Sequence, residues 1–186
     1  DDETNPTIGL NYTEKLIEED KVFALVGHFG TWTVGATLNL IQEKGVPMVY
    51  AATGINSLYF QESVGNPVMA VQPIYQTDGR IMTARAIKEK VYGPNHDEAL
   101  PANAKIGVIY TNDDVGLSIK AGIEQEAEIL GVTSNMLYQA VTTSFATAVT
   151  ILKAQGVSVL ILAMNQEPFG YALQQMHNVS LNVPVF

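Results

Sequence analysis

Two hydrophobic patterns alternate along the whole chain, and this alternation limits the fold more than any other feature. Short runs rich in Val, Ile and Leu are typical of strands buried on both faces, whereas longer stretches with apolar residues every three or four positions are typical of helices. A first helix is expected to begin at Asn5-Pro6, with Asn as its cap and Pro in the first turn. The expected strands cover residues 22–26, 46–51, 105–111, 133–139 and 158–163, with another at 183–186, and the later helices cover 31–44, 78–91, 116–130, 145–155 and 168–178. Strands that alternate with helices predict an α/β fold with doubly wound, mainly parallel sheets.

The low charge and the absence of cysteine exclude several classes of function. Of the 186 residues, 47% are hydrophobic and 16% are charged, and the net charge is −9. Because Lys and Arg are too few to neutralise a row of phosphates, we expect neither nucleic acid nor an anionic membrane surface as a partner. A chain without cysteine has no disulfide, thiolate metal site or cysteine nucleophile. The longest apolar run, residues 157–164, is far too short to span a bilayer.

Sequence motifs for catalysis and for nucleotide or metal binding are missing. There is no G-x-G-x-x-G, no Walker loop, no G-x-S-x-G and no H-E-x-x-H. Residues 112–114 (Asn-Asp-Asp) lack the acidic spacing and the distal Glu of a calcium loop, and such a cluster is more typical of a helix cap or a solvated loop. We therefore expect no catalytic residue, no metal and no cofactor, and we expect that the chain is not an enzyme.

Four loops follow the expected strands into the expected helices, and such loops converge on the ligand in parallel-sheet proteins. They are residues 27–31, 51–54, 111–114 and 164–167. In the first, Gly30 permits a close backbone approach, and Thr31 is expected to cap the next helix. The N–H groups of Trp32 and Thr33 would then be available to an anion, and a carboxylate suits them better than a phosphate because the loop has no Lys or Arg. The alternative, that Thr31 only caps its own helix, stays open.

The other loop residues carry weaker signals. The carbonyl groups and the Thr53 hydroxyl of the second loop are suited to an ammonium group, although an ordinary strand-to-helix turn explains them equally. His28 is a candidate ligand contact because it lies in the first loop. Phe29, Trp32 and Tyr59 are candidates for an apolar pocket, or they belong to the core.

The order and spacing of several segments resemble the leucine/isoleucine/valine-binding proteins, which are type I periplasmic binding proteins that serve ABC importers. The matching segments are residues 1–2 with 5–6, 15–22, 26–31, 46–47 with 53–54, 110–116, 153–162 and 169–176. The resemblance implies two doubly wound parallel-sheet lobes that close over a ligand, with lobe one in residues 1–74 and lobe two in 75–186. It also implies that both lobes are incomplete, because relatives have a strand and a helix before Asp1 and return to lobe one after Phe186.

The resemblance also implies roles for individual residues. In relatives, the positions of Thr31 and Thr53-Gly54 hold the ligand carboxylate, and those of Ala52 and the Thr53 hydroxyl help to hold the ammonium group. In lobe two, relatives usually have an aromatic residue at the position of Val115 and another close to Asn165-Gln166, and in lobe one they commonly have proline in place of Trp32. This chain departs from both patterns. The complete set of candidate ligand contacts is His28, Phe29, Gly30, Thr31, Ala52, Thr53, Gly54, Asp113, Val115, Asn165 and Gln166.

The resemblance therefore predicts an extracytoplasmic solute-binding receptor. Its ligand is expected to be an amino acid, branched-chain or a related small carboxylate, and its partners are the membrane subunits of an ABC importer. The expected location is periplasmic or extracellular, either free or as a membrane-anchored lipoprotein. Two alternatives remain: a ligand-sensing regulator or receptor domain of the same fold, and a doubly wound α/β enzyme.

Overall fold

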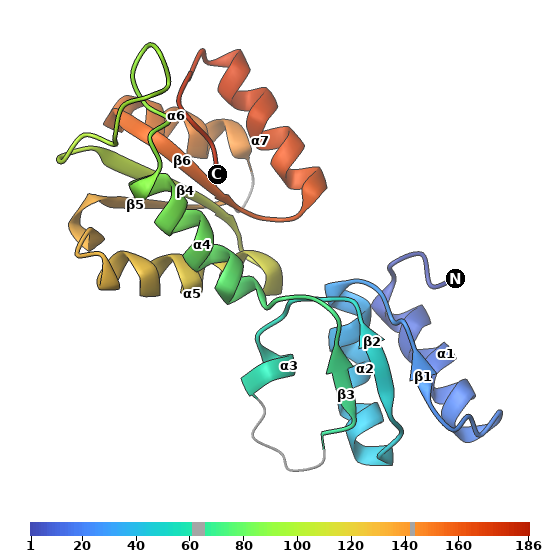
Figure 1. Ribbon diagram of the computed structural model, residues 1–186. Coiled ribbons are helices and arrows are strands. Elements are labelled where there is room, and N and C mark those ends of the chain that lie inside the picture. Colours follow the sequence, from blue (N-terminus) through green and yellow to red (C-terminus); the bar gives the residue numbers. More distant parts are fainter. Residues whose placement is uncertain (61–65, 142–143) are drawn as a thin grey trace. The chain divides into compact units, whose positions relative to one another are not determined.

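The computed structural model describes residues 1–60, 66–141 and 144–186, and the chain divides into two compact units (Figure 1). Unit one is Asp1–Ile74 and unit two is Tyr75–Phe186. Each unit contains a parallel sheet of three strands with its own helices. The α/β fold with parallel sheets is therefore confirmed.

Unit one contains a small sheet with the strand order β1-β2-β3. Its elements are α1 (Pro6–Glu18), β1 (Leu25–Val26), α2 (Thr31–Lys44), β2 (Met48–Ala51), α3 (Ser57–Phe60) and β3 (Val68–Ala70). The Asn5 side chain accepts hydrogen bonds from the N–H groups of Thr7 and Ile8, so the expected cap of α1 is confirmed. Helix α2 has the expected bounds and ends at Gly45, which adopts the left-handed conformation.

The first strand is shorter than the sequence pattern suggests. Residues 22–26 were expected to be extended, but only Leu25 and Val26 pair with β2. The reason is that the Val22 N–H bonds to the Leu16 carbonyl at the end of α1, 3.1 Å away, rather than to a strand. The Val22 N–H is thus bonded to the end of the helix and is not available to pair with a neighbouring strand.

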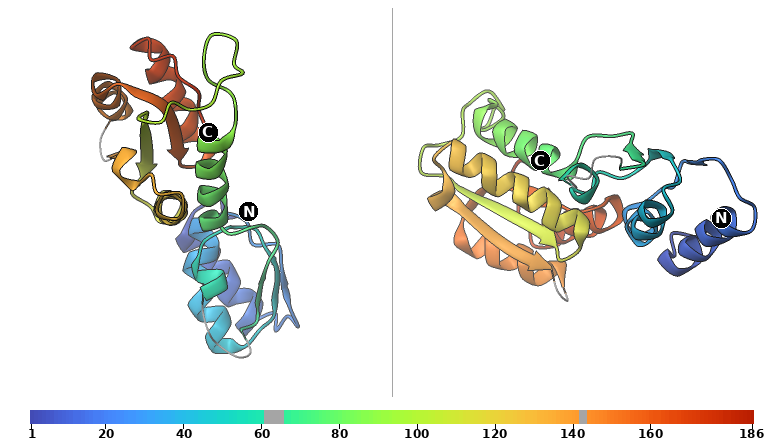
Figure 2. Two further views of the ribbon diagram at one scale, coloured as in Figure 1. Left: turned by 60° about the vertical axis from the view of Figure 1, so that its left-hand side comes forward. Right: turned by 90° about the horizontal axis from the view of Figure 1, so that it is seen from below.

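The sheet of unit one is buried on one face. Leu25 and Met48 are buried, and α1 and α2 lie on the same side of the sheet (Figure 2). Val26 and Met69 are 72% and 63% exposed, and Phe23, just before β1, is 93% exposed. Within the described residues, the opposite face of the sheet, away from α1 and α2, therefore presents apolar side chains to solvent.

Unit two has the strand order β5-β4-β6, and its strands are longer. Its elements are α4 (Tyr75–Lys88), β4 (Lys105–Thr111), α5 (Asp114–Ile129), the 3-10 turn η1 (Thr133–Asn135), β5 (Met136–Val141), α6 (Phe145–Gln155), β6 (Val157–Ala163) and α7 (Gln166–Asn178). Ile161 packs with side chains of α4 and α5 on one face, and Leu160 packs with side chains of α6 and α7 on the other. Helices cover both faces, which makes this unit doubly wound.

Several bounds in unit two differ from the expected ones. Helix α4 runs over residues 75–88 rather than 78–91, and α5 begins at Asp114 rather than Gly116. Residues 133–135 form a 3-10 turn instead of strand, because the Asn135 N–H bonds to the Val132 carbonyl at 2.9 Å and closes a turn there. At 183–186 the expected strand is reduced to a parallel bridge between Val185 and Leu160.

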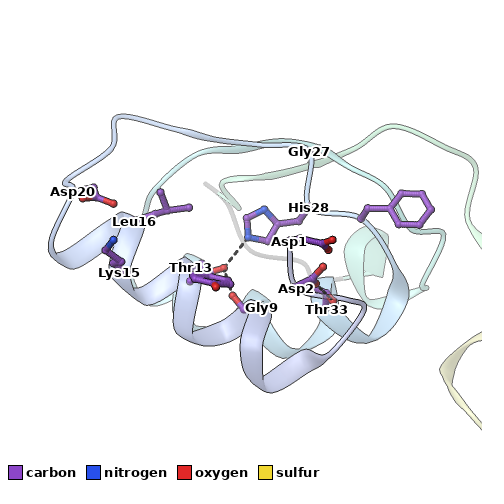
Figure 3. A pocket seen from close by; sticks show the side chains of 12 residues that line it. Asp1, Asp2, Gly9, Thr13, Lys15, Leu16, Asp20, Gly27, His28 and Thr33 are labelled. Atoms are coloured by element: carbon purple, nitrogen blue, oxygen red, sulfur yellow. Dashed lines mark hydrogen bonds between the residues drawn. The ribbon is translucent and has the colours of Figure 1, made fainter.

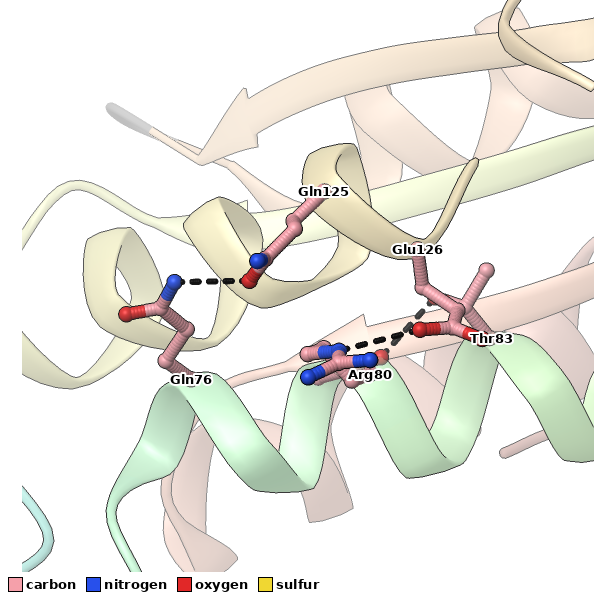
Figure 4. Close-up of polar contacts among 6 residues, drawn as sticks. Gln76, Arg80, Thr83, Gln125 and Glu126 are labelled. Atoms are coloured by element: carbon pink, nitrogen blue, oxygen red, sulfur yellow. Dashed lines mark hydrogen bonds and ion pairs between the residues drawn. The ribbon is translucent and has the colours of Figure 1, made fainter. Parts of the chain in front are cut away.

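Helices α4 and α5 cross at two glycines. A Cβ atom on Gly79 would lie 2.0 Å from the Ile119 carbonyl oxygen, and one on Gly122 would lie 1.9 Å from that of Gln76. Beside this contact, the Arg80 Nε donates to the Glu126 carboxylate at 3.0 Å, and the side-chain amides of Gln76 and Gln125 bond at 2.9 Å (Figure 4). The missing side chains thus allow a backbone approach that no other residue type permits.

Candidate ligand-binding site

The first two candidate loops are joined by backbone hydrogen bonds at the carboxyl ends of β1 and β2. The Ala52 N–H donates to the His28 carbonyl at 2.9 Å, and the Gly30 N–H donates to the Ala52 carbonyl at 3.2 Å. Gly30 has a φ of 93°, which side-chain-bearing residues rarely adopt. The backbone therefore holds the two loops together.

The expected cap of α2 is wrong by one residue. Gly30 occupies the cap position, and Thr31 is the first residue of the helix. The Val34 N–H is the first to bond back within the helix, to the Gly30 carbonyl at 2.9 Å. The N–H groups of Trp32 and Thr33 lie in the first turn, where no intrahelical carbonyl is available to them, as expected. Glycine rather than threonine is the cap because the cap residue, Gly30, has a positive φ, which favours glycine.

The Thr31 side chain instead meets the second loop. Its hydroxyl lies 2.8 Å from that of Thr53, and the two residues are 6% and 0% exposed. The Thr53 oxygen also accepts from the Ile55 N–H at 3.3 Å, and Gly54 beside it is buried. The loop of residues 27–31 has no Lys or Arg, so these hydroxyl groups and the first-turn N–H groups form a neutral polar site, which is suited to a small carboxylate.

His28 and Phe29 lie apart from this pair of hydroxyls. A pocket of about 420 Å³ in unit one is lined by His28, Phe29 and residues of α1, and Thr31 and Thr53 are not among its lining residues. The His28 ring points to α1, where its Nε2 lies 2.8 Å from the Thr13 hydroxyl (Figure 3). That hydroxyl donates its one proton to the Gly9 carbonyl, so its oxygen accepts from the Nε2–H. Phe29 is 72% exposed.

Among the charged lining residues of this pocket, Asp2 bonds to the Thr33 side chain of α2. A hydrogen bond from the Thr33 hydroxyl lowers the pKa of the Asp2 carboxyl below its ordinary value. Burial lowers the pKa of the His28 imidazole, and the Asp2 carboxylate opposes that effect in part. The sequence reading missed Asp2, Thr13 and Thr33 as partners because they become neighbours only when α1 packs on α2.

The stability of unit one should depend on pH through His28. Because burial lowers the pKa of His28 below its ordinary 6.5, the unfolded chain takes up the proton more readily than the folded unit. The contribution of His28 is therefore complete above pH 6.5 and is lost as the pH falls through the folded-state pKa. We expect the urea midpoint, followed by Trp32 fluorescence, to fall between about pH 7.5 and about pH 5.5, and to fall less in His28→Gln.

His177→Gln is the matched control, because it removes a histidine from unit two and should leave the pH dependence of the Trp32 signal unchanged. An equal fall of the midpoint in wild type and His28→Gln would contradict this prediction.

In unit two, the candidate residues have different local roles. Asp113 caps α5: its Oδ1 accepts from the Gly116 N–H and from the Thr111 hydroxyl, both at 2.9 Å. Val115 is 1% exposed and belongs to the core on the α4 and α5 side. Asn165 and Gln166 are exposed at the start of α7. The structure therefore supports the interpretation of residues 112–114 as a helix cap, with Asp113 as the capping residue.

A second pocket in unit two contains a residue that the sequence reading missed. Its volume is about 400 Å³, and Asp78, Val115 and Asn165 are among its lining residues. The sequence signal for Asp78 was an acidic residue at the start of an expected helix, which is too common to indicate a site.

Two further properties of the described residues bear on function. Residues 1–60, 66–141 and 144–186 contain no cluster of three or more His, Cys, Asp or Glu side chains suited to a metal ion. None of the helices in that same part of the chain is long and apolar enough to cross a membrane.

Solved structures of known proteins have the same fold as this chain. Three solved structures illustrate it: an ABC transporter substrate-binding protein from Desulfitobacterium hafniense in complex with Leu (18% identity, TM-score 0.73), a leucine binding protein from Thermotoga maritima (19%, 0.73) and an ABC transporter solute binding protein from R. palustris in complex with benzoate (17%, 0.70). They cover 100%, 97% and 100% of this chain, which in turn spans 52%, 48% and 48% of theirs. No curated protein matches the sequence.

The family assignment rests on a match that extends over nearly the whole chain. The family model for periplasmic binding proteins matches residues 1–185. One structural neighbour is named a type 1 periplasmic binding protein, and the two parallel sheets of this chain agree with its fold. This chain belongs to the periplasmic binding protein family.

Proposed function

We propose that this chain is part of an extracytoplasmic receptor that captures an amino acid or a similar small carboxylate for an ABC importer. Units one and two are the two lobes of that receptor, each represented in part. The receptor acts in the periplasm or outside the cell, free or as a lipid-anchored protein, and its partners are the importer's membrane subunits. No step of this function requires a catalytic group, a metal or a cofactor.

The observation that carries the proposal is the neutral polar site at the start of α2. The Thr31 and Thr53 hydroxyls lie 2.8 Å apart, next to first-turn N–H groups that carry the positive end of the helix dipole. A small carboxylate accepts hydrogen bonds from such groups and needs no cation beside it. A phosphate, with more charge, is normally held by Lys or Arg as well, and residues 27–31 contain neither.

The ligands named for two structural neighbours support the same class. Leu and benzoate both combine a carboxylate with an apolar body. We propose that Thr31, Thr53 and the Gly54 backbone contact the carboxylate of this chain's ligand, with Ala52 beside them. Asn165 and Gln166 are the proposed contacts of unit two, because they are exposed at the carboxyl end of β6.

A ligand panel tests the proposal. The chain is heated with each of the common L-amino acids and with benzoate, and compounds that raise the unfolding midpoint are measured by calorimetry. A ligand at about 100 times its Kd should stabilise the folded state by about 2.7 kcal/mol. In Thr31→Ala, a loss of one charge-assisted bond should weaken carboxylate binding about tenfold.

Thr31→Ser keeps the hydroxyl and is the matched control, so its affinity should stay close to that of wild type. Binding of nucleotides or sugars in place of carboxylates would contradict the proposal. Transport and sensing are separated by adding the liganded chain to the reconstituted importer, because only a transport receptor should stimulate its ATPase activity.

A further inference from the structure

The outer face of the unit-one sheet is the face opposite α1 and α2, and exposed apolar side chains cross it from strand to strand. The register pairs Val26 of β1 with Val49 of β2. On the other side of β2, the pairing of Met48 with Val68 brings Val49 next to Met69 of β3. Val26, Val49 and Met69 are all exposed. They form one apolar row across the three strands.

A β-bulge in β2 enlarges this outer face. The register shift gives β2 two residues, Val49 and Tyr50, where β3 has only Met69. In a regular strand, side chains alternate between the faces, and Tyr50 would point to the buried face. Instead both bulge residues are exposed, and Tyr50 has a φ of 67°, a left-handed conformation that is rare for large side chains. Backbone strain thus keeps an aromatic ring at the surface.

The strands of this sheet carry no charge. Leu25–Val26, Met48–Ala51 and Val68–Ala70 contain no Asp, Glu, Lys or Arg. Parallel sheets are normally covered on both faces, as helices cover both faces of the sheet in unit two. An uncharged apolar face on a parallel sheet is therefore suited to a second layer of apolar side chains.

The size of the outer face indicates what can cover it. Its exposed apolar side chains are those of Val26, Val49, Tyr50, Met69 and Val71. Together they expose on the order of 500 Å², close to the upper end of the largest apolar patch on a typical monomer, about 300–600 Å². Two such faces in contact bury about 1,000 Å², which is the lower limit for a specific protein–protein interface.

We propose that the outer face binds the outer face of a second copy of this chain, so that two unit-one sheets pack face to face in an isologous dimer. In such a contact each residue meets the same surface of its partner, and any charge on the face would meet a like charge. An uncharged face avoids that repulsion. The net charge of −9 on each chain opposes association, so we expect a micromolar rather than a nanomolar Kd. This inference goes beyond the proposed function and does not depend on it.

Sedimentation equilibrium over a range of about 1 to about 200 µM tests the proposal. We expect a monomer at the low end and a species of twice the monomer mass at the high end. Met69→Asp should weaken association about tenfold or more, because it places a charge in the apolar contact of both copies. Ile129→Asp is the matched control: Ile129 of unit two is 61% exposed and Met69 is 63% exposed. The same change there should leave the association unchanged.

Tyr50→Gly separates the interface from the stability of unit one. Glycine adopts a φ of 67° without strain, so the variant removes the ring and keeps the bulge. Its urea midpoint, followed by Trp32 fluorescence where the wild type is monomeric, should stay close to that of wild type. Its association should weaken about tenfold. A lower midpoint with unchanged association would assign Tyr50 to the fold alone and overturn the proposal.

Salt distinguishes an apolar contact from an ionic one. Raising NaCl from about 20 mM to about 500 mM screens the repulsion between the two acidic chains, so the dimer should tighten. Association that salt weakens would come from ion pairs and overturn the proposal, as would equal effects of Met69→Asp and Ile129→Asp. A monomer at every concentration would also overturn it, since another segment or another protein would then have to cover the face, and would leave the proposed ligand binding in place.

Discussion

Replacing Gly122 with alanine should lower the free energy of unfolding of unit two by about 2 kcal/mol, within the range for overpacked cores. The new Cβ would lie 1.9 Å from the Gln76 carbonyl oxygen, and that oxygen belongs to the backbone of α4, which no side-chain rotation can move. Helices α4 and α5 would have to separate. Ile119 and Ile123 of α5 are buried against the sheet, so separation loosens the core on that face.

Gly170→Ala is the matched control for this prediction. Gly170 is also a helical glycine of unit two, but a Cβ there meets nothing within 4 Å. Alanine should stabilise the helix at that site by about 0.5–1 kcal/mol. The two substitutions are chemically identical and should shift stability in opposite directions.

Urea unfolding followed by two signals checks this pair of variants. Far-UV circular dichroism reports the helices of both units, whereas fluorescence reports unit one, because the only tryptophan is Trp32. Gly122→Ala should shift the circular dichroism transition and leave the fluorescence transition in place. Equal stability of Gly122→Ala and Gly170→Ala would show that the α4–α5 contact is looser than described.

Replacing Thr53 with valine should destabilise unit one by about 1–3 kcal/mol, the usual cost of leaving a buried polar group unsatisfied. Valine has nearly the same shape but no hydroxyl. It removes the 2.8 Å contact with the Thr31 hydroxyl and the acceptor of the Ile55 N–H, and Thr53 is 0% exposed. Water therefore has little access to replace the lost oxygen.

Thr37→Val is the matched control because Thr37 is also 0% exposed. Among the described residues, its hydroxyl bonds to the Thr33 and Val34 carbonyls within its own helix α2, and the change should cost clearly less. Trp32 fluorescence during urea unfolding measures both variants. If the proposed function is correct, Thr53→Val should also weaken carboxylate binding while Thr37→Val should not. If both variants lost the same free energy of unfolding, the Thr31–Thr53 contact would contribute no more to stability than the hydroxyl bonds within α2.

The elements that the sequence predicted best are those defined by local signals. Helices α2 and α6 have the expected bounds because Gly45 and Gly156 end them, and both adopt a left-handed conformation that other residues disfavour. Strand β4 also has its expected bounds, since an unbroken apolar run indicates a strand buried on both faces. Strand-end loops follow directly from these bounds, so the neighbourhood of Thr31 and Thr53 was predictable.

Tertiary structure decided the features that depend on residues far apart in the chain. His28 bonds to Thr13 because α1 packs on α2, and no local pattern indicates that pair. Gly79 and Gly122 are ordinary helical glycines in the sequence, and only the crossing of α4 and α5 makes their missing side chains necessary. Asp78 reads as one more acidic residue in a first turn until the fold places apolar side chains around it. Local signals act through backbone conformation, which neighbouring residues set, whereas burial and partners depend on which surfaces meet after folding.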